Sequence, residues 1–414
     1  MTETTQETET TQETGMTPEL FNPFTPGFDE NPYEHYRTLR DTNPVHEHPM
    51  GFWFVSRHAD VSTLLRDARL SVADRNLAAG PMRDQFEQLA DAPVSLVTMM
   101  DSDPPVHTRL RSLVGKVFTP RSIAALEPKV TELVDKSLDR IADAGSVNLI
   151  DAFAFPLPFE VISAMLGMPD TDPTRLLELT ETLVIALEPV GDPEVMKAIV
   201  AAEVELAGMI QEVIAWKRNN PADDLLTALI QAEHNGDLLS NDELVAQVLL
   251  LYIAGHHTTV NLIGNGVTAL LHHPDQHALL RSNPDLIGNA IEEFLRYDSP
   301  THQTRRITLA PYQIGGLEIP AGEMMIACLG SANRDERAFG PDADVLRLDR
   351  EQARQHVSFS LGTHHCLGSA LARLEGRVAI SRLVSRFPGL ALSGPVSWNG
   401  RINLRGATDV PVSV

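Results

Sequence analysis

The residue in this chain with the clearest chemical potential is Cys366, one of only two cysteines among 414 residues. It lies in the turn FSLGTHHCLG (359–368), directly before a segment, 369–383, whose composition favours a helix. A thiol at a helix N-terminus is made more acidic by the helix dipole and by free backbone N–H groups. The other cysteine, Cys328, lies in an apolar, strand-like run and is expected in the core. The sequence therefore predicts a single reactive thiolate and no disulfide bond.

The surroundings of Cys366 favour iron over zinc as its metal. Zinc requires several sulfur or nitrogen ligands, whereas one thiolate in a dry pocket suits the fifth position of a haem iron. Gly362 and Gly368 allow the backbone to turn tightly and to pass close to a flat ligand. The alternative is a buried cysteine in a glycine-rich turn, which is the default interpretation of a lone cysteine.

The pattern F-x-x-G-x-H-x-C-x-G at 359–368 resembles the cysteine-ligand loop of the haem-thiolate monooxygenases, the cytochrome P450 family. The resemblance implies that the chain binds heme b (iron protoporphyrin IX) through the sulfur of Cys366. It also implies contacts with the cofactor from Phe359, Gly362 and Gly368. The general character of the sequence most resembles bacterial, particularly actinobacterial, members of the family.

A histidine and an arginine, His107 and Arg111, stand four residues apart after the turn Asp-Pro-Pro at 103–105. This spacing places both side chains on one face of a helix. Two haem propionates bring two negative charges into a pocket of low dielectric, where they need cationic or N–H donors. The H-x-x-x-R pattern resembles the family's propionate-binding helix, and the resemblance adds Arg306 and His364. The alternative for each residue is an ordinary solvated side chain.

The segment 241–272 predicts the longest helix of the chain, about 48 Å at 1.5 Å per residue. Ser240 and Glu243 form a capping box at its start, and Pro274 follows its end. Its largely apolar composition raises the alternative of a transmembrane helix. Polar residues between 247 and 265 interrupt it too often for that, so we expect a buried central helix.

The middle of this helix, AGHHTT at 254–259, resembles the family segment A/G-G-x-D/E-T. In that segment a small residue admits substrate and oxygen, and a threonine hydroxyl and an acid help to deliver protons. By this resemblance Gly255 is the small residue and Thr258 supplies the hydroxyl. Ala254 is expected to contact the cofactor, and Thr259 is expected to belong to the same catalytic segment. The acid position holds His257 instead. Its imidazole either relays protons or is a packing histidine, with protons arriving through water and Thr258.

Glu293 and Arg296 stand three residues apart in a predicted helix that begins near residue 285. An E-x-x-R pair also occurs in surface helices, where it contributes little. Here it precedes Tyr-Asp-Ser-Pro at 297–300 and lies about 70 residues before Cys366, as in the P450 family. The resemblance implies a brace for the haem-side core that includes a third polar side chain, which we assign to Arg334.

The elements that must position these groups are mainly helices. Apolar periodicity predicts further helices at 32–40, 123–142, 174–187, 193–217 and 222–233. Alternation of apolar and polar residues, with Gly/Pro turns, predicts a strand at 51–56. The same signals after Pro300 predict strands within 307–319, 323–329 and 391–414. The expected fold class is mostly α with a small β portion. The resemblance implies a cytochrome P450 fold, with haem between the long central helix and the cysteine loop and its helix.

Composition limits the partners and the location of the protein. A net charge of −23 argues against nucleic acid and anionic membranes as partners. No apolar segment precedes the globular part, and two unpaired cysteines fit a reducing compartment, so we expect a cytoplasmic protein without a membrane anchor. Residues 1–16, rich in Thr, Glu and Gln, predict a disordered tail, and 17–414 a single haem-thiolate catalytic domain. We expect a monomer.

Together the motifs imply a monooxygenase that hydroxylates or epoxidises a lipophilic small molecule, such as a polyketide, terpenoid or steroid, with O2. Candidate substrate contacts by resemblance are Val97, Leu183, Leu250, Ala254 and His302. The sequence shows no Gly-rich dinucleotide motif and no cysteine cluster, so electrons are expected from a ferredoxin and an NAD(P)H-dependent ferredoxin reductase. The alternatives are a peroxide-driven or oxidative-coupling haem enzyme, and a haem-binding ligand sensor without turnover.

Overall fold

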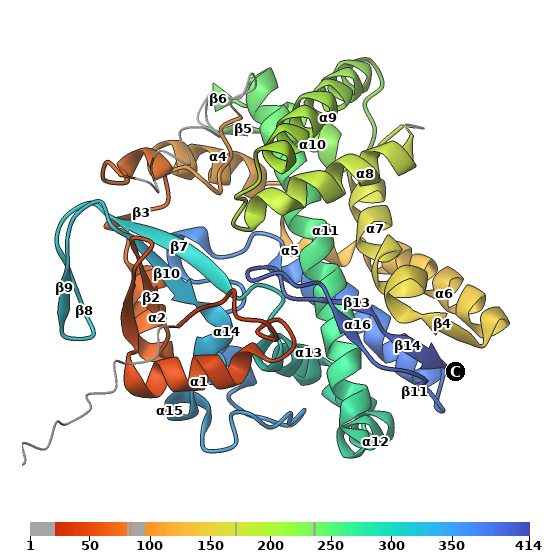
Figure 1. Cartoon of the computed structure of the whole chain (residues 1–414). Helices are drawn as coiled ribbons and strands as arrows, with labels where there is room; N and C mark the ends of the chain where they lie inside the picture. Colours follow the sequence, from red (N-terminus) through yellow and green to blue (C-terminus); the bar gives the residue numbers. More distant parts are fainter. Residues whose placement is uncertain (1–20, 81–82, 84–95, 170–171, 235–236) are drawn as a thin grey trace, which may run out of the picture.

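Helices form most of the computed structural model, which describes residues 21–80, 83, 96–169, 172–234 and 237–414. The predicted tail, 1–16, lies outside the described residues. Long helices gather on one side of the molecule, and a five-stranded sheet lies on the other (Figure 1). The mostly helical fold with a small β portion is as predicted.

Helices and strands are numbered in the order in which they occur along the chain. The α-helices are α1 Pro32–Thr42, α2 His58–Arg66, α4 Val106–Gly115, α5 Pro120–Ala124, α6 Glu127–Ala144, α7 Pro156–Leu166, α8 Pro173–Val184, α9 Pro193–Asn219, α10 Leu225–Gln231, α11 Asn241–His272, α12 Pro274–Ser282, α13 Ile287–Tyr297, α14 Leu329–Ala332, α15 Glu336–Phe339 and α16 Ser369–Arg386. The strands are β1 Val45–His48, β2 Phe52–Val55, β3 Leu70–Ser71, β4 Ser146–Asn148, β5 Glu233–His234, β6 Asp237–Leu238, β7 Gln303–Thr308, β8 Tyr312–Ile314, β9 Leu317–Ile319, β10 Met324–Cys328, β11 Ala391–Leu392, β12 Ser397–Trp398, β13 Ala407–Asp409 and β14 Pro411–Ser413.

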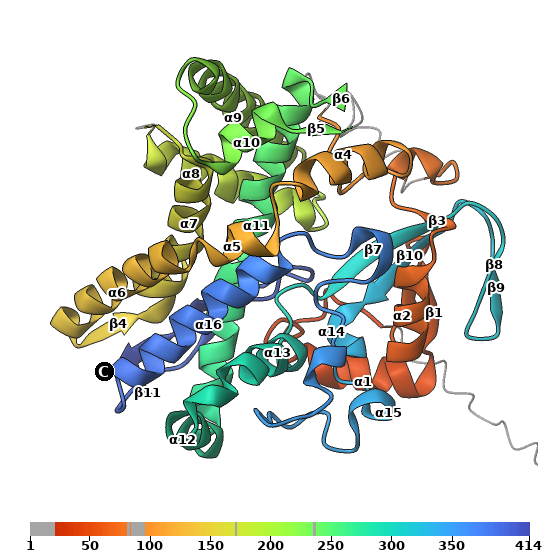
Figure 2. The ribbon, with the colours of Figure 1, turned by 180° about the vertical axis from the view of Figure 1, so that it is seen from behind.

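Helix α11 crosses the centre of the molecule and packs against α7, α9 and α16 (Figures 1 and 2). Its capping box of Ser240 and Glu243 forms as predicted. Buried polar side chains along it bond to the backbone of other segments: Gln247 donates to Val97 O at 3.2 Å and Asn265 to Arg405 O at 3.1 Å. The predicted buried central helix is confirmed. Among the described residues, no helix has the length and apolar character needed to cross a membrane.

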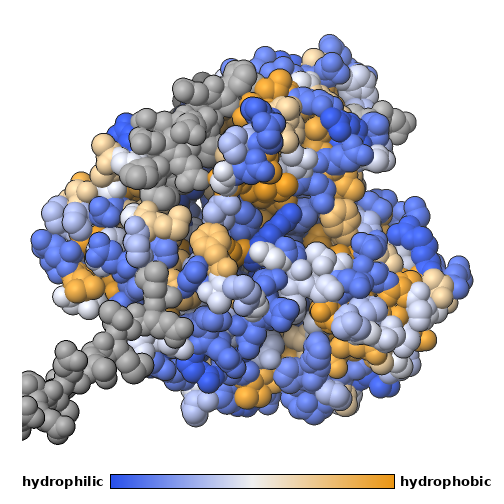
Figure 3. Space-filling view, in the orientation of Figure 1, coloured by the Kyte–Doolittle hydropathy of each residue, from blue (hydrophilic) through white to orange (hydrophobic). Residues whose placement is uncertain are grey.

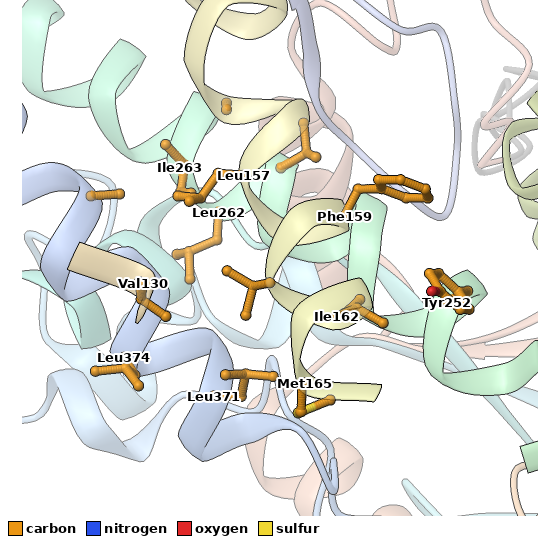
Figure 4. Packing of buried hydrophobic residues seen from close by; sticks show 14 of the residues in the cluster. Val130, Leu157, Phe159, Ile162, Met165, Tyr252, Leu262, Ile263, Leu371 and Leu374 are labelled. Carbon is orange, nitrogen blue, oxygen red and sulfur yellow. The ribbon is translucent and has the colours of Figure 1, made fainter. Parts of the chain in front are cut away.

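The helices share one apolar core, and Figure 4 shows its part between α6, α7, α11 and α16. The Phe159 ring of α7 lies 5.8 Å from the Tyr252 ring of α11, and the hydroxyl of Tyr252 lies 3.1 Å from that of Ser163. Each fully buried side chain of this size contributes about 1.5–3 kcal/mol relative to exposure. This packing fixes the middle of α11 against α7.

The five-stranded sheet has the order β1-β2-β10-β7-β3. Strands β2 and β10 run parallel, and the other neighbours run antiparallel. The register of β10 against β7 places Met325 opposite Arg306. The backbone of Arg306 is therefore held inside the sheet, which matters for the site described below.

Parts of the helical prediction differ from the structure. The segment 123–142 forms two helices, because Pro128 lacks an N–H and therefore occupies the first turn of a new helix, α6. The segment predicted at 222–233 shortens to α10, where the Asp224 side chain accepts from Thr227 N and sets the start. The sequence does not predict α7, because it is apolar almost throughout and has no amphipathic period.

Candidate active site

Cys366 is held at the start of α16 by its own loop. Its backbone N–H donates to Phe359 O at 2.8 Å. Gly362 has φ 69°, and a Cβ there would lie 2.7 Å from the carbonyl oxygen of Leu65 in α2. Glycine is thus required at 362 by backbone conformation and by packing against α2, and its predicted contact with the cofactor stays a prediction. Gly368 has an ordinary φ of −78°, so the tight turn that we expected at both glycines is present at Gly362 only.

The environment of the Cys366 sulfur raises the pKa of its thiol. The side chain has exposed surface, yet burial is the largest cause of the raised pKa. The N–H groups of Gly368 and Ser369 and the guanidinium groups of Arg111 and Arg373 oppose the rise. The N–H groups at the helix terminus thus favour the thiolate, as expected, and the positive charge of a bound metal would favour it further.

A cluster of nitrogen donors lies beside the cysteine loop. The rings of His107 in α4 and His364 are 4.3 Å apart between centroids. Burial, with His107 and Arg306 next in effect, lowers the pKa of His364 to about 4. Both ring nitrogens of His107 and Nη2 of Arg306 are buried without a hydrogen-bond partner among the described residues. A buried N–H group is costly unless an acceptor reaches it, and two carboxylates such as haem propionates would accept from Arg306 and from the protonated ring nitrogen of His107. These residues therefore fit the cofactor.

Arg111 contacts the cysteine loop directly, because its Nη2 donates to His365 O at 2.6 Å. A charge-assisted bond of this kind holds the loop next to the sulfur. Its predicted contact with a propionate stays a prediction. The neighbouring Arg109 pairs with Asp237 and Glu243, and so ties α4 to the start of α11.

One face of α11 carries Leu250, Ala254 and Thr258, at intervals of four residues. The Thr258 hydroxyl donates to Ala254 O at 2.7 Å, which leaves its oxygen able to accept from another donor. Gly255 lies on a different face, where a Cβ would lie 2.8 Å from Cδ1 of Ile162 in α7. The predicted role of Gly255 in admitting oxygen is therefore corrected to close helix packing. Thr259, one turn further on, shares the face of Gly255.

The two histidines before Thr258 contact different neighbours. His256 Nε2 donates to Phe155 O at 2.8 Å, and burial followed by His257 lowers the pKa of His256 to about 4. His257 Nε2 lies 2.5 Å from Oε1 of Glu181 in α8. Burial raises the pKa of the Glu181 carboxyl, but its contacts with His257 and His256 outweigh this, so the pKa is lowered. A carboxylate from α8 thus faces the residue that replaces the family's acid.

The predicted substrate contacts divide by their burial. Leu183 of α8 and Leu250 of α11 are buried, whereas the Val97 side chain is 51% exposed and its carbonyl accepts from Gln247 of α11. Apolar side chains gather on the surface over α8, α9 and α10, in the upper half of Figure 3. This end of the molecule therefore exposes apolar side chains among hydrophilic ones.

His302 is a core residue and not a pocket residue, which corrects its prediction as a substrate contact. Its Nδ1 lies 3.1 Å from the Tyr36 hydroxyl, and its Nε2 lies 3.5 Å from that of Tyr33. Its side chain is 1% exposed, and burial lowers the pKa to about 3. The sequence could not show that aromatic residues near the N-terminus enclose this ring.

Glu293 and Arg296 form a buried bidentate ion pair, with Nε–Oε2 at 2.7 Å and Nη2–Oε1 at 2.8 Å. The third side chain on Glu293 is Arg350, whose Nε lies 3.2 Å from Oε1. The assignment of Arg334 to this position is wrong. Arg334 Nε donates instead to Tyr297 O at 2.6 Å, and its guanidinium stacks 3.7 Å from the centre of the Tyr297 ring.

The sequence missed two charged residues of this site, Glu181 and Arg350. Each meets its partner through the tertiary fold: Glu181 across the contact of α8 with α11, and Arg350 from a loop. Neither residue stands three or four positions from its partner in the sequence, so the spacing within a motif could not predict either contact.

Glu375 of α16 is a buried acid whose titration should make the stability of the protein depend on pH. It is 1% exposed, burial raises its pKa to about 8, and its Oε2 has no hydrogen-bond partner within the described ranges. Above pH 4.5, the ordinary pKa of this carboxyl, the unfolded chain has lost the proton. The folded state keeps it up to about pH 8. Stability from this group is fully present below about pH 4.5 and is lost as pH rises towards 8.

Glu375→Gln keeps the shape of the protonated acid and removes this titration. We expect the free energy of unfolding to rise by about 2–4 kcal/mol at pH 8, and by much less at pH 5. Denaturant unfolding of both proteins at the two pH values measures this difference. An equal effect at both pH values would show that Glu375 does not titrate between them.

Comparison with known proteins agrees with this geometry. The sequence model of the family described as Cytochrome P450 matches residues 29–389. Cytochrome P450 107B1 of Saccharopolyspora erythraea is 40% identical over 414 residues, which cover 96% of this chain and 98% of the relative. Vitamin D(3) 25-hydroxylase of Pseudonocardia autotrophica is 41% identical, with 94% and 96% covered. The solved structure of myxobacterial cytochrome P450 CYP267B1 in complex with myristic acid matches with a TM-score of 0.87 at 36% identity, and covers 94% of this chain and 98% of its own.

The chain therefore belongs to the cytochrome P450 family, of the bacterial type. It is a cytochrome P450 monooxygenase whose cofactor is heme b, bound in this family through a cysteine thiolate. The predicted family, fold, enzyme class and cofactor are confirmed.

Proposed function

We propose that the protein inserts one oxygen atom from O2 into a C–H or C=C bond of a lipophilic small molecule. The observation that carries this proposal is the α11 face on which Leu250 and Ala254 lead to the Thr258 hydroxyl. Apolar side chains beside a single polar group favour an apolar ligand with one reacting end. Two similar proteins support this class of substrate, one named as a vitamin D(3) hydroxylase and one solved with myristic acid.

Heme b supplies the redox-active iron at which O2 is reduced. The side chains of this chain hold and orient that chemistry. Cys366 would hold the iron through its sulfur, and its N–H bond to Phe359 O fixes the loop. His107 and Arg306 offer unpaired donors to the propionates and so set the position of the ring. The apolar α11 face would exclude water and orient the substrate beside the cofactor.

Proton delivery falls to Thr258 and His257 in this proposal. The Thr258 hydroxyl oxygen can accept from a water that carries the proton. A neutral imidazole accepts on one nitrogen while it donates from the other, so His257 can pass protons inward from the Glu181 side. The alternative is that His257 only packs between α8 and α11.

Thr258→Ala is expected to lower the fraction of consumed NAD(P)H that ends in oxygenated product by at least about tenfold, with peroxide formed instead. This estimate is below the usual contribution of a general acid or base, about 10²–10⁴-fold. The measurement compares NAD(P)H consumed with product and peroxide formed, and Thr258→Ser is the matched control because it keeps the hydroxyl. Unchanged product yield in Thr258→Ala would contradict the role of this hydroxyl, and unchanged yield in His257→Ala would identify a packing histidine.

The electron donor that we propose is an acidic ferredoxin, reduced by its NAD(P)H-dependent reductase. Against the net charge of −23, Lys116 and Arg121 are exposed at the end of α4 and in α5. Helix α5 packs against α16, whose first turn follows Cys366. A cationic surface there would attract an acidic partner towards the sulfur side of the haem.

Reconstitution of the holoenzyme tests the proposed function. A panel of steroids, terpenoids, polyketides and fatty acids is screened for ligands that shift the Soret band from low to high spin. Each ligand is then incubated with ferredoxin, reductase, NAD(P)H and ¹⁸O₂, and we expect a product that carries one ¹⁸O atom. Product formation that needs only peroxide would favour a peroxide-driven enzyme, and a spectral shift without product under any condition would favour a ligand sensor.

A further inference from the structure

A second group of metal-ligating side chains, which does not include Cys366, lies between α8 and α11. It consists of Glu181, His256 and His257, and one ligand atom from each lies within 4.8 Å of those of the other two. His256 and His257 are buried, and the Glu181 side chain is 40% exposed. The cluster therefore joins two helices of the apolar end of the molecule and has one side open to solvent.

One ligand atom of this cluster is left without a partner. His256 Nδ1 is buried and has no hydrogen-bond partner among the described residues. Glu181 Oε1 and His257 Nε2 lie 2.5 Å apart and pair with each other. A buried polar atom without a partner costs about 1–3 kcal/mol. An ion that binds His256 Nδ1 together with this pair would supply the missing partner.

The hydrogen bonding of His256 suits a metal ligand. Its Nε2 lies 2.8 Å from Phe155 O, which can only accept, so Nε2 carries the proton and Nδ1 keeps a lone pair. Metal-bound histidines commonly donate their other N–H to a backbone carbonyl in this way. With an ionised Glu181 the cluster offers two imidazoles and one carboxylate, the donor set of an open zinc site.

We propose that Glu181, His256 and His257 bind a divalent first-row transition metal such as Zn²⁺, at a site separate from the haem. Zinc bonds of about 2.0–2.2 Å place tetrahedral ligand atoms about 3.4 Å apart. That value lies between the 2.5 Å contact and the 4.8 Å limit of the cluster, so small side-chain rotations suffice. Water fills the fourth position, and the exposed part of Glu181 gives the ion a path from solvent. Imidazole ligands favour Zn²⁺ over Mg²⁺.

Zinc at this site ties α8 to α11 and occupies the His257 nitrogen that faces Glu181. This consequence rests on the proposed function, in which His257 relays protons towards Thr258. Zinc should then lower the yield of product per NAD(P)H, and a chelator should restore it.

Calorimetric titration of tag-free holoenzyme with ZnCl₂ tests the site without any turnover. We expect one zinc ion per chain, no comparable heat with MgCl₂, and affinity weakened at least about tenfold in Glu181→Gln and in His256→Gln. Glu181→Gln is the safer variant because this side chain is partly exposed. Zinc-edge X-ray absorption should show two imidazoles and one carboxylate.

The adjacent pair His272 and His273 gives a matched control at the end of the same helix. Their Nδ1 atoms bond to Thr268 O and Ala269 O at 2.9 and 2.7 Å, so His273→Ala should leave zinc affinity unchanged. Absence of zinc binding in wild type, or equal affinity in wild type and Glu181→Gln, would overturn the proposed site. Zinc that binds with the expected ligands but leaves the product yield unchanged supports the site and counts only against the proton relay.

Discussion

Cys366→His is expected to abolish oxygenation while the fold and some haem binding remain. An imidazole can ligate haem iron, but it does not donate electron density as a thiolate does. The loop should persist, because its closing bond from residue 366 to Phe359 O is made by the backbone. Product formation per bound haem should fall at least about 100-fold, since loss of even an outer-shell partner of a metal ligand costs up to about that factor.

The other cysteine supplies the control for this variant. Cys328 ends β10 and is fully buried, so Cys328→Ala removes a thiol without touching the loop. We expect it to oxygenate as well as wild type per bound haem, even where the yield of protein falls. Wild-type activity per haem in Cys366→His would show that the sulfur is not the functional ligand.

Arg296→Met is expected to have the largest effect on stability. The guanidinium is fully buried and donates to both oxygens of Glu293, to Asn333 O at 2.9 Å, to Ala343 O at 2.7 Å and to Val345 O at 3.2 Å. Its removal leaves a buried carboxylate with fewer partners and takes the Arg296 donor from Asn333 O and Ala343 O, whereas Val345 O keeps its bond from Arg350 Nη2. Breaking a buried ion pair in this way costs about 3–5 kcal/mol. Denaturant unfolding measures the loss, and the yield of haem-loaded protein should fall with it.

An exposed ion pair of similar geometry serves as the comparison. Arg382 of α16 pairs with Asp135 of α6 at 2.5 Å, and both side chains are more than a third exposed. Arg382→Met should cost no more than about 1 kcal/mol, because water replaces the lost contacts. Equal losses in Arg296→Met and Arg382→Met would show that the brace around Glu293 contributes no more than a surface pair.

The parts of the site that the sequence predicted correctly depend on short-range spacing. Helix α11 has the predicted bounds, because a capping box and a following proline are local signals that need no tertiary contact. His107 and His364 were named from separate motifs, and their rings meet at 4.3 Å. In each case the residue type and its distance along the chain carry the information.

The errors concern the direction in which a side chain points after the chain has folded. Gly255 faces Ile162 of α7, and His302 is enclosed by Tyr36, although both stand at the expected distance from a motif. Several arginines follow β10, and only packing decides that Arg350 turns towards Glu293. The partner of His257, Glu181, comes from another helix, so no pattern within α11 could indicate it.

The central claim is that Cys366 binds haem iron as a thiolate in a catalytic P450 site. The most direct test is the absorption spectrum of the reduced wild-type protein under carbon monoxide. Thiolate ligation predicts a Soret band at about 450 nm, with no such band in Cys366→His. A wild-type protein that shows only the band of an imidazole-ligated haem, under conditions that keep it folded, would contradict the assignment.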